Sequence, residues 1–231
     1  MAKLINLYHG SNKIITNPTF GLGKKNNDFG LGFYCTEYED LAKEWAVSSL
    51  EDGFSNQYSI DIEYLKILNL NDEKYTILNW IAILLENRLF SISNPNVRKA
   101  KKYLIDNFGI NVNAFDIIFG YRADDSYFDY ADAFINNMIS VSQLAKAMRL
   151  GKLGNQIVIK SKYAFSLLKF EKFDVAKKDI YYCLRKNRND EANKKYLEIL
   201  NDDDSDGLFV QDIIRGGIKN NDPRIPRNIF K

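Results

Sequence analysis

Short apolar runs bounded by glycine, asparagine or proline alternate along the chain with longer stretches of helical periodicity. Runs of β-branched and aromatic residues, continuous or at every second position, predict strands at 3–9, 32–35, 58–70 (one or two strands), 115–121, 155–161 and 165–173. Apolar residues spaced three and four apart predict helices after Thr36, within 73–107, at 126–137, after Ser140 and at 174–200. The chain therefore mixes strands and helices throughout, and its sequence has no internal repeat.

Local start and stop signals predict where several helices begin and end. Thr36 is followed three residues later by Glu39, which is the pattern of a capping box at a helix start. Ser140 and Gln143 have the same spacing. Gly109 is expected to end the helical stretch that precedes it.

The order of these elements predicts an α+β fold. Residues 1–173 form a domain that carries the strands, and the helical stretch at about 73–109 interrupts it as an insertion. Residues 174–231 form a helical C-terminal extension packed on that domain, with a basic tail that is either partly ordered or docks an acidic partner or nucleic acid. The acidic cluster at 201–207 is expected to be a solvated loop, with weak binding of a hard cation as the alternative.

Composition and charge limit the compartment and the partners. Apolar residues make up 45% and aromatic residues 13% of the 231 residues, which is enough for a core. A formal net charge of +2 neither demands nor excludes nucleic acid. The N-terminal residues lack a secretory signal, the two cysteines lie far apart, and the longest apolar run, 80–85, is too short to cross a bilayer. We therefore expect a soluble cytoplasmic protein without a membrane partner.

The scarcity of histidine and cysteine excludes several chemistries. One histidine and two separated cysteines cannot supply the usual ligands of a zinc site, so we expect no metal. A hydrolase with a serine or cysteine nucleophile would have to use His9 as its base, and Cys35 keeps a thiol mechanism open. No lysine followed by serine or threonine closes the glycine stretch at 21–32, which excludes a Walker loop.

The single histidine lies in the stretch LYHGS at 7–11, at the end of the first predicted strand. His9 with Gly10 offers one side-chain donor or acceptor beside an open backbone, which suits a ligand carrying a carboxamide or a ribose hydroxyl. Tyr34 follows a glycine-rich loop, and Trp45 lies eleven residues later on the inward side of a helix. The alternatives are a hydrogen-bonded core histidine and core aromatic residues.

These motifs resemble the ADP-ribosyltransferases of the histidine-tyrosine-glutamate class, which includes the poly(ADP-ribose) polymerases and diphtheria toxin. The first motif of that class is a strand ending in His-Gly-(Ser or Thr), matched here by residues 9–11. The second reads roughly Gly-x-Gly-Ile-Tyr with a further aromatic residue eleven positions later in the polymerases, matched by 30–34 and Trp45. The resemblance covers 7–45 and, loosely, 154–170, and it implies a split, mostly antiparallel sheet core.

The resemblance implies a role for each matched residue toward NAD as a substrate. His9 would bind the adenosine-side ribose and orient NAD. Backbone groups of Gly10 would hold the amide of nicotinamide, with Ser11 beside them. Tyr34 and Trp45 would stack on the two faces of the nicotinamide ring.

Two positions depart from the pattern of the class. The late strand begins with Gln156, where the class has a glutamate that stabilises the positive charge on the ribose as nicotinamide leaves. A neutral amide stabilises that charge less, and losing one such contact typically costs about a hundredfold in rate. Ala42 stands where the polymerases have a serine that binds the nicotinamide amide, and Ser11 is the hydroxyl that could replace it.

Three explanations of Gln156 stay open: a slow transferase, a transferase whose acid comes from elsewhere, and a domain that binds NAD without turnover. Asp124 and Asp125, at the end of the fourth predicted strand, are the candidates for an acid from elsewhere. Their alternative role is to cap and stabilise the start of the following helix. With His9 and Tyr34, Gln156 completes the expected catalytic set.

The function that the resemblance implies is an NAD-dependent mono-ADP-ribosyltransferase that modifies a protein or a nucleic acid. A second likeness, to an uncharacterised bacterial family thought to lie near toxin-antitoxin loci, implies a toxin or effector with an antitoxin protein as partner. The rival functions are a non-catalytic module that binds NAD or ADP-ribose, an NAD hydrolase and an RNA 2'-phosphotransferase. Release of nicotinamide, labelling of a macromolecule and phosphate transfer from RNA ends distinguish them.

Overall fold

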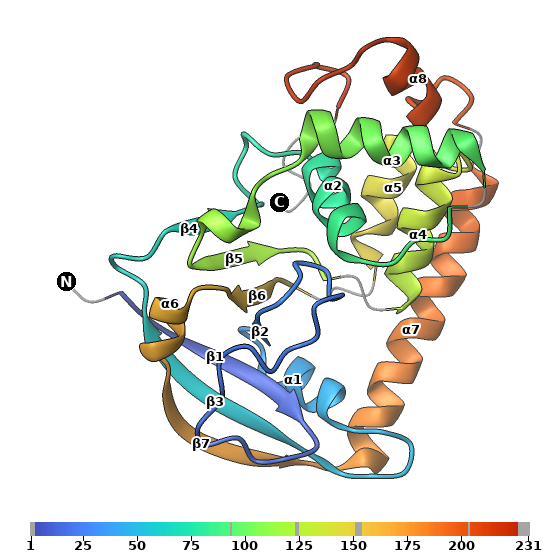
Figure 1. The fold of residues 1–231 in the computed structure, drawn as a ribbon. Coiled ribbons are helices and arrows are strands. Elements are labelled where there is room, and N and C mark those ends of the chain that lie inside the picture. Colours follow the sequence, from blue (N-terminus) through green and yellow to red (C-terminus); the bar gives the residue numbers. More distant parts are fainter. Residues whose placement is uncertain (1–2, 93, 123–124, 151–153, 203, 226–231) are drawn as a thin grey trace.

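The chain folds into two β-sheets and a layer of helices (Figure 1). The computed structural model describes residues 3–92, 94–122, 125–150, 154–202 and 204–225, with the side chains of 125–127 excepted. Strands and helices are interleaved along the sequence, and most strand pairs are antiparallel. The predicted α+β class is confirmed.

The first sheet has three antiparallel strands in the order β1-β3-β7. They are β1 (Leu4–Ser11), β3 (Gly53–Asp61) and β7 (Lys169–Ala176). The second sheet has the order β2-β6-β5-β4, with a parallel β4–β5 pair beside two antiparallel pairs. Its strands are β2 (Phe33–Cys35), β6 (Gln156–Ile159), β5 (Ile117–Gly120) and β4 (Ile67–Asn69).

Apolar side chains from the two sheets meet in a shared core beside the short helix α6 (Lys162–Ser166). Leu7 and Ile60 come from the first sheet, Ile117 and Ile157 from the second, and all four are fully buried. Each side chain of this kind stabilises the fold by about 1.5–3 kcal/mol relative to an exposed position. This contact holds β2 and β6 against β1.

The second sheet carries a layer of helices on its other side (Figure 1). The helices of this layer are α2 (Ile77–Asn87), α3 (Pro95–Phe108), α4 (Asp125–Ile135), α5 (Val141–Ala147) and α8 (Val210–Arg215), with a 3-10 turn at Val112–Ala114. Helix α2 is buried on nearly all sides because it is apolar around most of its circumference. Even so, no helix within the described residues is long and apolar enough to span a bilayer.

Two predicted helix ends are confirmed. Ser140 Oγ accepts the backbone N–H of Gln143 at 3.1 Å, and Gln143 Oε1 accepts the backbone N–H of Ser140 at 3.0 Å, which closes the capping box of α5. Gly109 is the C-cap of α3 and donates its N–H to Ile105 O at 3.0 Å. Both ends depend on partners within four residues, so the local sequence is sufficient to predict them.

The prediction of a capping box at Thr36 and Glu39 is wrong. Helix α1 spans Glu39–Ala46, its N-cap is Tyr38, and no side chain caps it. The Thr36 backbone instead forms hydrogen bonds of 2.8 and 2.9 Å with Tyr8, and its Oγ1 accepts the Tyr38 N–H. This bridge links β1 with the end of β2, and because its partner is distant in sequence, no local pattern shows it.

Several strand limits also differ from the predicted ones. The segment 58–70, predicted as one or two strands, contains the end of β3 and all of β4, but β3 already begins at Gly53. The start of β3 is not visible in the apolar pattern because it contains polar residues that are buried, among them Asn56. Strand β7 extends past the predicted domain end at 173 to Ala176.

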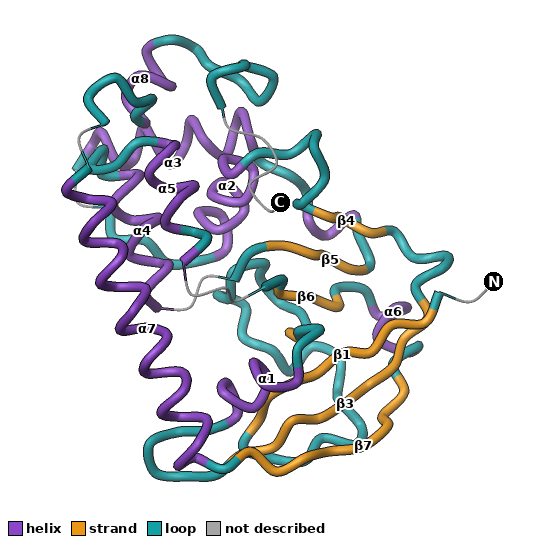
Figure 2. The backbone as a smooth tube through the Cα atoms, turned by 180° about the vertical axis from the view of Figure 1, so that it is seen from behind, coloured by secondary structure: helices purple, strands orange, loops and turns teal. Residues whose placement is uncertain are grey.

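The predicted C-terminal helix is present as α7 (Lys178–Asn201), which runs from the end of β7 to the helical layer (Figures 1 and 2). After α7 the chain returns to the helical layer, where Ile213, Ile218 and Ile225 are buried. The described part of the basic tail therefore packs on the protein. Residues 226–231 lie outside the described residues.

Candidate functional site

A cavity of about 650 Å³ opens where β1 and β2 meet β6, α1 and α7. His9, Gly10, Tyr34, Trp45 and Gln156 all line it. They come from strands of both sheets and from a helix, so the fold brings together residues that the sequence separates. The volume lies in the usual range for small-molecule and cofactor sites.

His9 is held by a hydrogen bond and a ring contact. Its Nδ1 lies 2.7 Å from Tyr34 O, and its ring stacks on Phe33 with 4.4 Å between the ring centroids. Because a carbonyl oxygen only accepts hydrogen bonds, Nδ1 carries the proton. Burial lowers the pKa of His9, and the hydrogen bond with Tyr34 offsets this only in part. The ring is therefore neutral at pH 7, which leaves Nε2 as an acceptor for a ligand hydroxyl.

The affinity for a ligand that binds Nε2 of His9 is expected to be constant with falling pH down to 6.5, the ordinary pKa of histidine. At lower pH the ring titrates at its lowered pKa, so Nε2 gains a proton and no longer accepts a hydrogen bond. The affinity for such a ligand is therefore expected to decrease. The free energy of unfolding decreases in the same range, because the unfolded chain binds this proton more readily. Calorimetric titrations between about pH 8 and pH 5 measure the affinity.

The matched control for this pH dependence is His9→Phe, which keeps an aromatic ring against Phe33 but cannot titrate. Its free energy of unfolding should lack the decrease that the native chain shows below pH 6.5. A native midpoint at or above pH 6.5 would show that burial does not govern the titration of this ring.

Gly10 lies where β1 passes close to α1. A Cβ atom at this position would lie 2.0 Å from Ala42 O and 3.0 Å from Ala46 N. A side chain is therefore excluded on the face toward α1, and the same glycine borders the cavity. The predicted ligand role of Gly10 and its packing role coincide at one position.

Gly10→Ala is expected to lower the free energy of unfolding by about 3 kcal/mol, because β1 or α1 has to shift to admit the added methyl group. Urea denaturation measures the change. The comparison variant is Gly21→Ala, where φ is +87° but no atom lies within 4 Å of the added methyl group. That substitution should cost only about 1–2 kcal/mol, from backbone strain. Equal losses in the two variants would contradict the steric account.

Tyr34 contributes a ring rather than a hydroxyl to the cavity. Its hydroxyl donates to Gly30 O at 2.5 Å and accepts the Phe29 N–H at 3.1 Å. Burial, reinforced by the charge of Asp28, raises the pKa of Tyr34 far above its ordinary value, so the phenol is neutral. Lys160 Nζ holds the same loop by donating to two of its carbonyl groups, each at 2.8 Å. The glycine loop thus fixes the orientation of the aromatic ring.

Trp45 lines the cavity, and one face of its indole is covered. The guanidinium carbon of Arg122 lies 3.3 Å from the centroid of the Trp45 ring. A planar cation over an indole is a favourable contact. Tyr34 and Trp45, the two predicted aromatic residues, therefore line the same cavity, and the guanidinium group of Arg122 stacks on Trp45.

Gln156 is the first residue of β6 and pairs with Gly120 of β5. The residue is 6% exposed and lines the cavity, and its Oε1 is buried with no hydrogen-bond partner among the described residues. Buried acceptors are usually satisfied, because an unmade hydrogen bond costs about 1–3 kcal/mol. The amide oxygen therefore lacks a hydrogen bond, which a ligand hydroxyl that reached it would supply.

The other predicted site residues contribute differently. Ser11 does not line the cavity, and its Oγ accepts the Lys13 N–H at 3.2 Å. Asp124 lies outside the described residues, as does the side chain of Asp125, which begins α4. A role for these acids in place of the missing glutamate stays a prediction.

The structure also bears on the thiol mechanism and on metal ligands. Cys35 is fully buried, and burial raises the pKa of its thiol far above the ordinary value. A thiol in this state is not an effective nucleophile, so Cys35 is a core residue. Among the described residues, no three His, Cys, Asp or Glu side chains are grouped as ligands for a metal ion.

The sequence interpretation missed several charged residues at the cavity. Asp28 Oδ1 and Arg88 Nε form an ion pair at 3.5 Å, and both residues line the cavity, as does Arg122. The sequence held a signal for two of them, because Asp28 lies two residues before the glycine motif at 30–34 and Arg122 directly follows a predicted strand. The charged residues that α7 adds gave no signal, because a charged helix is typical of a solvated surface.

A scan against protein-family models matches residues 5–170 to a family described as proteins of unknown function, DUF3990. The match covers more than half of the chain, which therefore belongs to this family. A search of curated proteins finds no match, and a search of solved structures finds none either. The matched segment ends before α7, so this wall of the cavity lies outside it.

Proposed function

We propose that this protein is an NAD-dependent mono-ADP-ribosyltransferase whose two sheets have an ADP-ribosyltransferase-like arrangement. The observation that carries the proposal is the meeting of His9, Gly10, Tyr34, Trp45 and Gln156 in one cavity. These are the residues whose motifs resemble the histidine-tyrosine-glutamate class. If the short motifs matched by chance, there would be no reason for their residues to share a cavity.

In the proposed reaction, the bond between the anomeric carbon of the ribose and the nicotinamide nitrogen breaks, and its electron pair leaves with nicotinamide. A lone pair on a nucleophilic atom of the target captures the ribosyl cation, and the proton of that nucleophile passes to solvent. His9 Nε2 accepts a hydrogen bond from a hydroxyl of the adenosine-side ribose and so orients NAD. The buried Oε1 of Gln156 carries a partial negative charge next to the site, which stabilises the cation less than a carboxylate would.

The Arg122 side chain affects how the nicotinamide ring enters the site. The ring carries a positive charge in NAD, as the guanidinium does, so both are attracted to the same face of Trp45. Stacking of the ring on that face requires Arg122 to move away. One planar cation then replaces another, so the charge over the indole is unchanged by the exchange.

A non-catalytic module that binds NAD or ADP-ribose is the second candidate, and the observation that favours it is the amide of Gln156 in place of a carboxylate. An NAD hydrolase, in which water captures the cation, fits the same cavity. The macromolecular target, an antitoxin partner and a bacterial effector role in the cytoplasm are parts of the proposal that rest on the resemblance.

Transfer of label from NAD tagged on its adenosine side tests the proposal. The purified protein is incubated with labelled NAD and bacterial lysate, and His9→Ala serves as the control. Label retained on protein or nucleic acid, and lost in the variant, supports the transferase and identifies the polymer. Release of nicotinamide without a labelled polymer supports the hydrolase. NAD that is bound but stays intact supports the module.

A further inference from the structure

Helix α7 forms one wall of the cavity although it lies beyond the segment that matches the family. The α7 residues at the cavity are Tyr182, Arg185, Lys186, Asn189 and Asp190. They recur at intervals of three and four positions, so they form one stripe along the helix. The face that α7 turns toward the cavity is therefore polar and contains two cationic side chains.

Polar contacts hold α7 in place at its start and in its middle. Lys178 donates its backbone N–H to Asp52 Oδ1 at 2.9 Å. The guanidinium of Arg188 forms a bidentate ion pair with Glu44 of α1, whose side chain is 2% exposed. Breaking such a buried pair is strongly unfavourable, so it fixes how α7 is rotated against α1.

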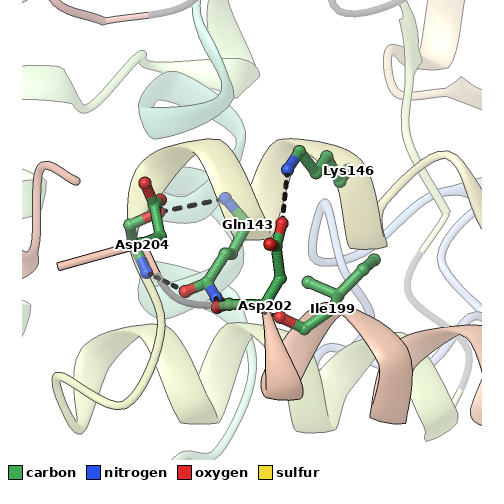
Figure 3. Close-up of polar contacts among 6 residues, drawn as sticks. Gln143, Lys146, Ile199, Asp202 and Asp204 are labelled. Atoms are coloured by element: carbon green, nitrogen blue, oxygen red, sulfur yellow. Dashed lines mark hydrogen bonds and ion pairs between the residues drawn. The ribbon is translucent and has the colours of Figure 1, made fainter. Parts of the chain in front are cut away.

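The other end of α7 is attached to α5 (Figure 3). Gln143 Nε2 donates to Ile199 O and to Asp202 O, each at 3.0 Å, and Lys146 Nζ pairs with Asp202 Oδ2 at 3.1 Å. The helix is therefore anchored at both ends as well as in its middle. Its stripe of cavity residues keeps a fixed position relative to β1 and β6.

The charges that line the cavity are unevenly neutralised. Four cationic side chains and two carboxylates border it. Arg88 is paired with Asp28 at 3.5 Å, and Arg122 is stacked on Trp45. Stacking on an indole does not remove the charge of Arg122, so the cavity keeps an excess of positive charge, to which the two cations of α7 contribute. This excess suits an anionic part of a ligand.

Two neighbouring α7 residues provide part of this charge. One guanidinium nitrogen of Arg185 donates to Glu44 O at 3.0 Å, which orients the side chain and leaves further N–H groups for a ligand. Lys186 is exposed at the cavity and forms no ion pair within the part of the chain that the structure describes. Asp190, one turn further along, lines the cavity and is exposed as Lys186 is, so it offsets part of this charge.

We propose that Arg185 and Lys186 form a subsite for the diphosphate group of the ligand. The forked guanidinium suits two phosphate oxygens at once, and the lysine adds a compact positive charge beside it. The choice of NAD as the ligand rests on the proposed function, whereas the subsite requires only two adjacent phosphates.

Calorimetric titration of Lys186 variants with ADP-ribose and with nicotinamide tests the subsite. Lys186→Ala is expected to raise the Kd for ADP-ribose about tenfold, and Lys186→Glu is expected to raise it further. The Kd for nicotinamide, which carries no phosphate, should be unchanged. Added salt should weaken the binding of ADP-ribose to the native chain more than its binding to Lys186→Ala. The matched control is Lys194→Glu, an exposed lysine on the same helix away from the cavity, which should bind as the native chain does.

Unchanged affinity for ADP-ribose in Lys186→Glu, or no binding of ADP-ribose to the native chain, would overturn the subsite. Turnover of NAD by the same proteins separates this result from the proposed function. Nicotinamide release with the same KM in Lys186→Glu rejects the subsite and supports the enzyme. Binding of ADP-ribose that depends on Lys186, without nicotinamide release, supports the subsite and rejects the enzyme.

Discussion

Gln156→Glu should release nicotinamide from NAD about a hundredfold faster than the native chain. The substitution keeps the length of the side chain, whose terminal oxygen is buried next to the cavity and has no hydrogen-bond partner among the described residues. A full negative charge then replaces a partial one beside the ribosyl cation, and the preorganised charge stabilises the transition state more than the bound substrate. Single-turnover measurement of nicotinamide release with saturating NAD isolates this step.

The same substitution should lower the free energy of unfolding, because a carboxylate is buried where a neutral amide was. The loss should grow as the pH rises above the ordinary pKa of glutamate, since burial raises the pKa of a carboxyl group in the folded chain. Gln57→Glu on β3, away from the cavity, is the matched control and should not change the rate. A folded Gln156→Glu that binds NAD but releases nicotinamide no faster would show that Gln156 does not face the anomeric carbon.

The second large effect is expected for His9→Ala, with kcat/KM for nicotinamide release falling about a hundredfold. The variant removes the acceptor Nε2 and also the ring that Tyr34 O and Phe33 hold in place. NAD then loses the contact that orients its adenosine-side ribose, so the reacting bond is misplaced. Steady-state release of nicotinamide measures the loss.

Because His9→Ala leaves a cavity that could disturb the fold, His9→Phe is the companion variant. It retains an aromatic ring against Phe33 and should be folded by circular dichroism, yet it lacks the acceptor. We expect the same loss of kcat/KM in both variants. Activity close to native in a folded His9→Phe would contradict the role of Nε2.

The part of the site that could be predicted from sequence depends on short-range spacing. His9 and Gly10 are adjacent, and Tyr34 and Trp45 lie on a strand and the helix that follows it. The spacing of these residues depends on local structure and not on how distant parts of the chain pack. The α+β class and the capping box at Ser140 were predictable for the same reason.

Buried polar residues explain why the start of β3 was not predicted. Asn56 is fully buried, and its Oδ1 accepts the Ile15 N–H at 2.8 Å. Its Nδ2 donates to His9 O at 3.3 Å and to Lys13 O at 3.2 Å. The alternation of apolar and polar positions fails here, because a polar side chain on the inner face holds the chain that follows β1.

The position of α7 at the cavity could not be predicted, although the helix itself was. The contacts that fix it join residues far apart in sequence, such as Arg188 with Glu44 and Gln143 with Ile199. Ala192 is its buried residue, so no apolar stripe indicates which face of α7 lies inward. Which charged residues of α7 line the cavity follows from how α7 packs against α1, and the sequence pattern does not show this packing.

A crystal structure of the protein with NAD bound tests the central claim most directly. We expect a hydroxyl of the adenosine-side ribose to donate a hydrogen bond to His9 Nε2. The nicotinamide ring should lie against Tyr34, and Arg122 should be displaced from Trp45. NAD bound outside the cavity, or in it with no contact to His9, Tyr34 or Gln156, would contradict the account.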